Sequence, residues 1–292
     1  MQMKTKTTKH RRKKPEMNNV LLTAVLGIGL AACCTASYMV YSFSEEQDHI
    51  NEEIHYAEAG LDESTMFGGF SAEEMAEGYD PPGKEDGKYI INVPMVNQFP
   101  ELPVGCEIAS EAAVLQFLGF DADKITLAED YIPKNDDIYD DIHHFLYGPD
   151  PAEYFVGDPF TWGYGCYSPV IADSMNRYFL MHGSGNKAVD MKDLTGNELD
   201  MLLEAGVPVI VWASQDMEPF VYRDSSCWTV KKNGKNIRWL GNSHTLVLVG
   251  YDREMYYFMD CGGKTDITPY KRELFISRWE ENGSQAVAVK RA

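Results

Sequence analysis

The sequence predicts an α+β fold for residues 89–292, which by size form one domain. Segments with the apolar spacing of helices come first in this region, and segments typical of strands follow them. A hydrophobic content of 44% and an aromatic content of 12% are those of a chain that folds around a core. Residues 44–88 carry 14 acidic residues against two lysines and are expected to form an acidic stalk, with helical stretches near 45–60 and 71–78.

The domain is expected to open with a strand and a helix. Residues 89–96 alternate between apolar and other side chains, which is typical of a strand. Residues 106–118 are expected to form a helix, because Ile108, Ala112 and Leu115 recur on one face.

Loops and two further helices are expected to follow. Residues 121–165 are acidic and rich in loops. Residues 168–181 form a helix with Ser168 as the N-cap and a proline at the first helical position. Residues 195–205 form another helix, capped by Thr195 or a nearby asparagine and ended by a glycine.

Four strands are expected in the second half of the domain. The continuous apolar run Val207–Ala213 predicts a strand buried on both faces. His244–Tyr251 and Glu254–Met259 predict two strands joined by a short turn, and Gln285–Lys290 predicts a last one.

Asn233-Gly234 is the strongest two-residue hairpin signal in the chain. A turn at this position sets Val230 opposite Ile237 and Trp228 opposite Trp239, with all four side chains on one face. Two interpretations stay open. The side chains form a small aromatic cluster on a solvent-exposed ribbon, or the hairpin is a flap that binds substrate.

The net charge of −19 combines two oppositely charged parts. Residues 1–19 carry seven Lys or Arg against one acid, while residues 20–292 carry 19 basic and 44 acidic residues. Residues 20–43 contain no charged residue and are long enough to span a bilayer as a helix. The basic tail before this anchor orients the N-terminus to the cytoplasm and the domain to the outside of the cell membrane. The acidic body repels polyanions, which argues against nucleic-acid binding.

A cleaved signal segment is the alternative to this anchor. Leu30-Ala31-Ala32-Cys33 resembles a bacterial lipobox, after which Cys33 would carry a lipid. Apolar residues continue for ten positions beyond Cys33, whereas mature lipoproteins usually become polar there. This favours the uncleaved anchor, and both alternatives place the domain outside the cytoplasm.

Cys106 is the strongest candidate for a nucleophile. It follows Gly105 and opens a predicted helix, where partial positive charge and free N–H groups favour the thiolate. A buried structural cysteine is the alternative interpretation.

His244 is the one histidine of seven that opens an apolar strand, and Asp260 ends the next predicted strand. Adjacent antiparallel strands bring the start of one close to the end of the next, so the two side chains are expected to be neighbours. A cysteine followed by a histidine and an acid is the set that a thiol peptidase needs. The thiolate attacks, the imidazole shuttles the proton, and the acid fixes the ring tautomer.

Four separated blocks resemble the extracellular peptidase C39-like domains of Gram-positive bacteria, which are papain-fold relatives of the peptidases that mature bacteriocins. The resemblance covers residues 90–290 and implies a papain-like cysteine peptidase fold, in which the helix carrying the cysteine packs on an antiparallel sheet. The blocks are VPMVNQFPELPVGCEIASEAAVLQFLGF, FVGDPFTWGYGCYSPVIADSMNRYF, GVPVIVWAS and HTLVLVGYD.

The resemblance implies Cys106 as nucleophile, His244 as base and Asp260 as the residue that orients the base. It also implies Gln98, eight positions before the cysteine, as a hydrogen-bond donor to the oxyanion. The residues that flank His244 and Asp260 differ from those common in the family. This difference weakens the assignment to a subtype of the family more than the expected chemistry of the triad.

No metal or cofactor is expected. The acidic segment 135–144 could hold a metal only if its loop were helical, so a solvated acidic loop is favoured. One disulfide among Cys166, Cys227 and Cys261 is compatible with an extracellular domain, and the third thiol would stay free or join another chain.

Together these features predict a membrane-anchored extracellular cysteine peptidase that acts on a peptide or protein substrate. Two other functions use the same fold. One is a catalytically silent cell-surface binding module. The other is a thiol-dependent cell-wall amidase or acyltransferase.

Overall fold

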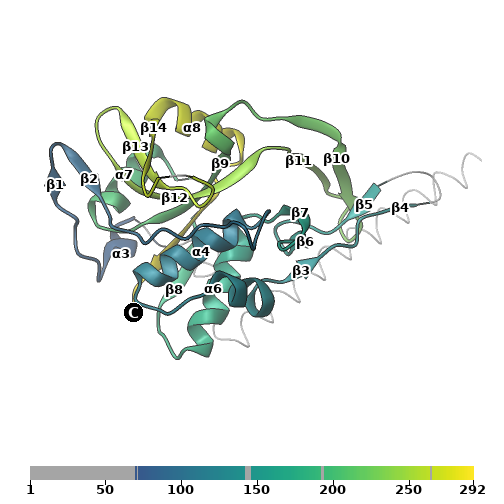
Figure 1. The fold of residues 1–292 in the computed structure, drawn as a ribbon, viewed down its shortest axis with the longest axis horizontal. Helices are drawn as coiled ribbons and strands as arrows, with labels where there is room; N and C mark the ends of the chain where they lie inside the picture. Colours follow the sequence, from purple (N-terminus) through teal and green to yellow (C-terminus); the bar gives the residue numbers. More distant parts are fainter. Residues whose placement is uncertain (1–69, 71, 142–145, 192–193, 264) are drawn as a thin grey trace, which may run out of the picture. The chain divides into compact units, whose positions relative to one another are not determined.

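The computed structural model describes residues 70, 72–141, 146–191, 194–263 and 265–292, and its centre is an eight-stranded antiparallel sheet (Figure 1). The strand order is β1-β2-β12-β9-β15-β8, with β13 beside β12 and β14 beside β13. The bounds of these strands are β1 Lys84–Glu85, β2 Lys88–Ile90, β8 Lys187–Asp190, β9 Val209–Ser214, β12 Ser243–Tyr251, β13 Met255–Met259, β14 Thr268–Lys271 and β15 Ala286–Lys290.

Helices cover both faces of this sheet (Figure 1). On one face, α4 Cys106–Phe117 and α6 Ser168–Met181 pack against each other and against the sheet. On the other face, α7 Gly196–Glu204 and α8 Arg272–Glu281 both contact Tyr256 of β13, whose hydroxyl donates to α7 at 2.9 Å and whose ring packs on α8. All residues of β9 are buried, as expected for a strand covered on both faces.

Two smaller sheets lie beside the main one. The first has the order β11-β10-β5-β4, and the second has the order β3-β6-β7. The bounds of their strands are β3 Lys134–Asn135, β4 Tyr139–Asp140, β5 Leu146–Gly148, β6 Phe155–Asp158, β7 Trp162–Gly165, β10 Tyr222–Val230 and β11 Asn236–Leu240. The remaining short helical segments are α3 Ala72–Ala76, α5 Lys124–Thr126, the π-helical turn η1 Leu127–Tyr131 and the 3-10 turn η2 Gln215–Met217.

The three predicted helices are present with small differences. Ser168 is not the N-cap of α6 but lies in its first turn, where its hydroxyl donates to Asp190 at 2.7 Å. Thr195 caps α7 in a capping box with Glu198. α4 is buried from Cys106 to Leu115, not on one face alone, because it lies between β12 and α6.

The predicted hairpin forms, but with another register. Trp228 pairs with Ile237, two positions away from the predicted partner Trp239. A two-residue type I′ turn needs positive φ at both central residues, and here only Gly234 of the Asn233-Gly234 pair has it, so the loop is longer. Because the shift is of two residues, the four predicted side chains still share one face, and all are buried.

The first described residues pack on the domain and do not form a stalk. α3 lies within the expected helical stretch 71–78, and its Met75 is fully buried. Tyr79 is buried too, and its hydroxyl donates to the carbonyl of Val289 in β15 at 2.7 Å. The folded domain therefore includes residues 72–88, and its expected start at residue 89 is too late.

The expected basic tail, the anchor at 20–43, the alternative lipidation site Cys33 and the stalk before residue 70 lie outside the described residues. Within the described ranges, no helix combines the length and the apolar character that crossing a membrane requires.

Candidate active site

Five of the six predicted site residues meet at one cleft of about 750 Å³, and the sixth, Trp228, is not in its lining. Gln98, Cys106, His244 and Asp260 all line it, together with Trp239 of the hairpin. They come from distant parts of the chain, and the start of α4 and the sheet around β12 bring them together.

Cys106 is the first residue of α4, as predicted, and it is 9% exposed. A Cβ atom on the preceding Gly105 would lie 2.8 Å from the Cβ of Leu102, so only glycine allows this close packing of the loop on the helix. Burial, and then the carboxylate of Glu107, raise the pKa of the Cys106 thiol well above its ordinary value. This opposes the expectation that the helix terminus alone favours the thiolate.

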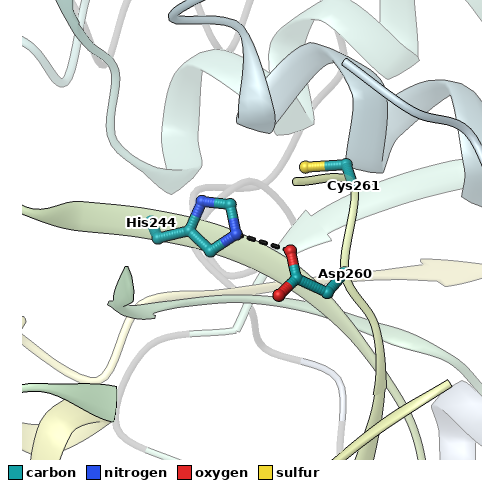
Figure 2. Close-up of side chains that lie close together, drawn as sticks. All are labelled: His244, Asp260 and Cys261. Carbon is teal, nitrogen blue, oxygen red and sulfur yellow. Dashed lines mark hydrogen bonds and ion pairs between the residues drawn. The ribbon is translucent and has the colours of Figure 1, made fainter. Parts of the chain in front are cut away.

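His244 and Asp260 are direct neighbours, as expected from the order of their strands (Figure 2). His244 Nε2 lies 2.7 Å from Asp260 Oδ1, and the N–H of Gly262 donates to the same oxygen at 3.0 Å. Burial opposes the ionisation of Asp260, but the hydrogen bond and charge of His244, together with the backbone N–H groups of Gly262 and Gly263, outweigh it and lower the pKa of this carboxyl. The Asp260 carboxylate is therefore held ionised and fixes the ring of His244 through Nε2, which leaves Nδ1 on the side away from Asp260 (Figure 2).

Gln98 is buried at the edge of the cleft. Its amide nitrogen donates to the carbonyls of Leu102 and Pro103, at 3.2 Å each. Its amide oxygen accepts from the thiol of Cys261 at 3.4 Å. Both amide hydrogens are thus engaged, and an oxyanion role requires the amide to exchange one of these bonds.

The two tryptophans of the hairpin have different surroundings. Trp239 lines the cleft, whereas Trp228 is absent from its lining and donates its Nε1–H to the carbonyl of Pro149 at 2.8 Å. Both belong to a small second core in which Tyr164 and Tyr167 pack against them. The predicted cluster therefore exists, and one of its members also faces the cleft.

Cys261 places a third candidate ligand beside His244 and Asp260 (Figure 2). In the described part of the chain, these three residues are the one group of three or more His, Cys, Asp or Glu whose possible ligand atoms lie within 4.8 Å of one another. A thiol binds a metal as the thiolate, whereas burial and the Asp260 charge raise the pKa of Cys261. The neutral thiol of Cys261 is thus a poor metal ligand, and Asp260 is already bonded to His244.

The possible disulfide is absent, and Asp140 does not meet the helical condition for a metal site in the acidic segment. Cys166 and Cys261 are both buried free thiols, so no disulfide forms among Cys166, Cys227 and Cys261. In the acidic segment, Asp140 belongs to strand β4 and not to a helix, while 142–145 lie outside the described residues.

Glu107 is a site residue that the sequence reasoning missed. It follows Cys106, lines the cleft and is 3% exposed. Its Oε2 lies 3.4 Å from the Cys106 sulfur, and its Oε1 accepts from the N–H of Cys166 at 3.1 Å. An acid in the first turn of a helix is ordinarily a solvated partner of the helix dipole, so its position alone gave no signal of burial.

Comparisons with known proteins identify the family and the fold of this chain. The sequence profile of the Peptidase_C39 like family matches residues 90–287. This chain belongs to that family. Its C39-like domain is 30% identical over 213 residues to the uncharacterized protein YvpB of Bacillus subtilis strain 168, a match that covers 69% of this chain and 76% of YvpB.

A solved structure supports the fold of the C39-like domain. A crystal structure from Bacillus anthracis, named for its likeness to C39 peptidases, is 32% identical and superimposes with a TM-score of 0.62. The match covers 71% of this chain and 99% of that protein. The α+β, papain-like peptidase fold expected from the sequence is therefore confirmed for this domain.

Proposed function

We propose that this protein is a cysteine peptidase in which Cys106 attacks the substrate carbonyl and His244 carries the proton. The observation that carries the proposal is the 2.7 Å bond between His244 and Asp260, in the cleft that Cys106 also lines. Membership of the C39-like family supports the same reaction class.

The proposed reaction follows from the properties of these groups. Burial keeps the resting Cys106 as a neutral thiol, so His244 acts as a general base through Nδ1 and removes the proton as the sulfur attacks. The Asp260 carboxylate stabilises the imidazolium that results. The imidazolium then protonates the leaving amine, and water hydrolyses the thioester. The developing oxyanion would face the N–H of Cys106 at the start of α4, where helix N–H groups have no partner within the helix.

The test is labelling by an electrophilic thiol probe, followed by mass spectrometry. The probe should modify Cys106 in the wild type, and the rate should fall strongly in His244→Ala. His182→Ala is the matched control, because His182 bonds its own helix at Tyr178 and is not part of the cleft. Labelling that is equal in all three proteins would reject the peptidase in favour of a silent binding module.

A second assay separates the substrate classes. Peptide libraries and purified peptidoglycan are digested with wild type and with Cys106→Ser as the inactive control. Cleavage of peptides supports the peptidase. Cleavage of peptidoglycan alone would assign the same residues to a cell-wall amidase.

We further propose that residues 20–43 anchor the protein in the cell membrane with the domain outside, on the basis of their length and the flanking charges. Protease added to intact cells should then release a fragment of about 25–30 kDa by cutting the exposed polar segment before the domain. Protection until lysis would contradict this orientation. Loss of membrane attachment in Cys33→Ser would identify a lipid anchor in place of the helix.

A further inference from the structure

The resting thiol of Cys106 is hydrogen-bonded to a carboxylate. In the structure its S–H donates to Glu107 Oε2 at 3.4 Å, while Nε2 of His244 is engaged with Asp260. A negative charge at this distance stabilises the thiol and opposes the thiolate. In the resting state, the thiol of Cys106 therefore donates its hydrogen bond to Glu107 and not to its proposed base, His244.

The chain is shaped to hold this carboxylate in place. Gly165, at the end of β7, has a φ of +115°, and a Cβ atom there would lie 2.2 Å from Glu107 Oε1. The next residue, Cys166, donates its N–H to that oxygen at 3.1 Å. Its carbonyl accepts from the Trp212 indole at 2.9 Å, which fixes this peptide segment to the central strand β9. The position of Glu107 is thus set by residues far away in the sequence.

Several titratable groups face Glu107 from the packed elements. Cys106 lies beside it on α4, Cys166 follows β7, His244 comes from β12 and Cys261 follows β13. Glu111, one turn further along α4, is bonded to Ser174 instead, at 2.7 Å. Among the described residues that line the cleft, none is Lys or Arg.

We propose that Glu107 is a positioning residue that holds the resting Cys106 thiol, and that neutralisation of this carboxylate releases the thiol to His244. Burial raises the pKa of Glu107 to about 7, so solvent protons can neutralise it near neutral pH. When Glu107 takes up one proton, its O–H can donate to the sulfur. The thiol proton then passes to His244 Nδ1, which gives a thiolate and an imidazolium. This inference rests on the proposed function, because it needs Cys106 and His244 as a catalytic pair.

The test is the pH profile of iodoacetamide alkylation of Cys106 in the full-length protein. In Glu107→Gln the charge is lost, the amide oxygen can still accept from Cys166, and the amide N–H can donate to the sulfur. The midpoint of the profile should fall by about one pH unit or more. A one-unit fall raises the thiolate fraction about tenfold at low pH. A thiolate of lower pKa is also less nucleophilic, which reduces the alkylation rate per thiolate about threefold. The net alkylation rate should thus rise about three- to tenfold.

Glu111→Gln is the matched control, because it removes a buried acid from the same helix without touching the cleft. Its profile should match that of the wild type. An unchanged midpoint in Glu107→Gln would reduce Glu107 to a structural partner of Cys166. Slower alkylation would make Glu107 a base for Cys106, and either result overturns the proposal.

A spectroscopic measurement covers the case in which Glu107→Gln does not fold. The S–H stretching band of Cys106, assigned by its loss in Cys106→Ser, should shift as Glu107 titrates, and a constant band would overturn the proposal. Failure of the proposed function gives a different result, because His244→Ala would then leave the alkylation profile of Cys106 unchanged while the Glu107 effect persists.

Discussion

Replacement of Asp260 by asparagine removes one charge from the site and keeps a hydrogen-bond acceptor. The bond from His244 Nε2 to Asp260 Oδ1 is 2.7 Å long, at the short end of the range for charge-assisted bonds. Such bonds contribute about 1.5–3 kcal/mol, against about 0.5–1.5 kcal/mol for neutral ones. Asp260→Asn should therefore cost about 1–1.5 kcal/mol of transition-state stabilisation, or about tenfold in kcat/KM.

The orientation of the new amide decides whether this magnitude holds. The N–H of Gly262 donates to Oδ1 at 3.0 Å, so the oxygen of the introduced amide is favoured at this position over its nitrogen. Asp260→Ala removes both the charge and the acceptor and should lose about 3 kcal/mol, or on the order of a hundredfold. An amide nitrogen facing the ring would select the wrong tautomer and cost about ten-thousandfold.

The assay is kcat/KM on the substrate found by digestion of the panels, with thermal unfolding as the check on folding. The pKa of Asp260 is lowered in the folded state, so its ionised form stabilises the fold above about pH 4, and this contribution is lost as the pH falls further. Asp260→Asn should thus be less stable than wild type at pH 7 and similar to it near pH 2. Equal kcat/KM of the wild type and both variants would refute the reasoning.

Three other predictions concern the surroundings of the site. Burial raises the pKa of Glu111 to about 8, so the folded state binds a proton that the unfolded state releases above about pH 4. The free energy of unfolding should therefore fall by up to about 1.4 kcal/mol per pH unit between pH 5 and 8. Urea unfolding of Glu111→Gln should show a smaller fall over the same pH range. Trp239→Ala should lower kcat/KM because it opens the cleft wall, whereas Trp228→Ala should cost about 3–5 kcal/mol of stability. Equal losses of kcat/KM in the two variants would contradict a kinetic role for Trp239 and a structural role for Trp228. Tyr79→Phe should cost about 1–2 kcal/mol in urea unfolding at unchanged kcat/KM, because the carbonyl of Val289 loses its buried partner.

The pairing of His244 with Asp260 could be predicted because it depends on local information. The two strands follow one another along the chain, and an antiparallel turn brings their ends together whatever else the fold contains. The position of Cys106 could likewise be predicted from local information, since a glycine and an apolar repeat mark the start of α4.

The position of Glu107 could not be predicted, because it depends on contacts between segments far apart in the sequence. Its burial follows from contacts with Gly165 and Cys166, almost sixty residues later, and the apolar repeat of a helix gives no information about such contacts. The helix α8 escaped prediction for another reason. Only Phe275 and Trp279 are buried in it, so it has too few apolar side chains for a clear repeat.

The contacts of the first described residues bear on how the domain can be produced in isolation. Phe70 lies beneath the ammonium groups of Lys187 and Lys290, and the guanidinium of Arg291 lies over the ring of Tyr79. A recombinant fragment that begins at residue 90, where the family match begins, would lack these partners and leave the apolar surface beneath Met75 open to water. Such a fragment should aggregate on expression, and one that begins before Phe70 should stay monodisperse at the concentrations that crystallisation requires.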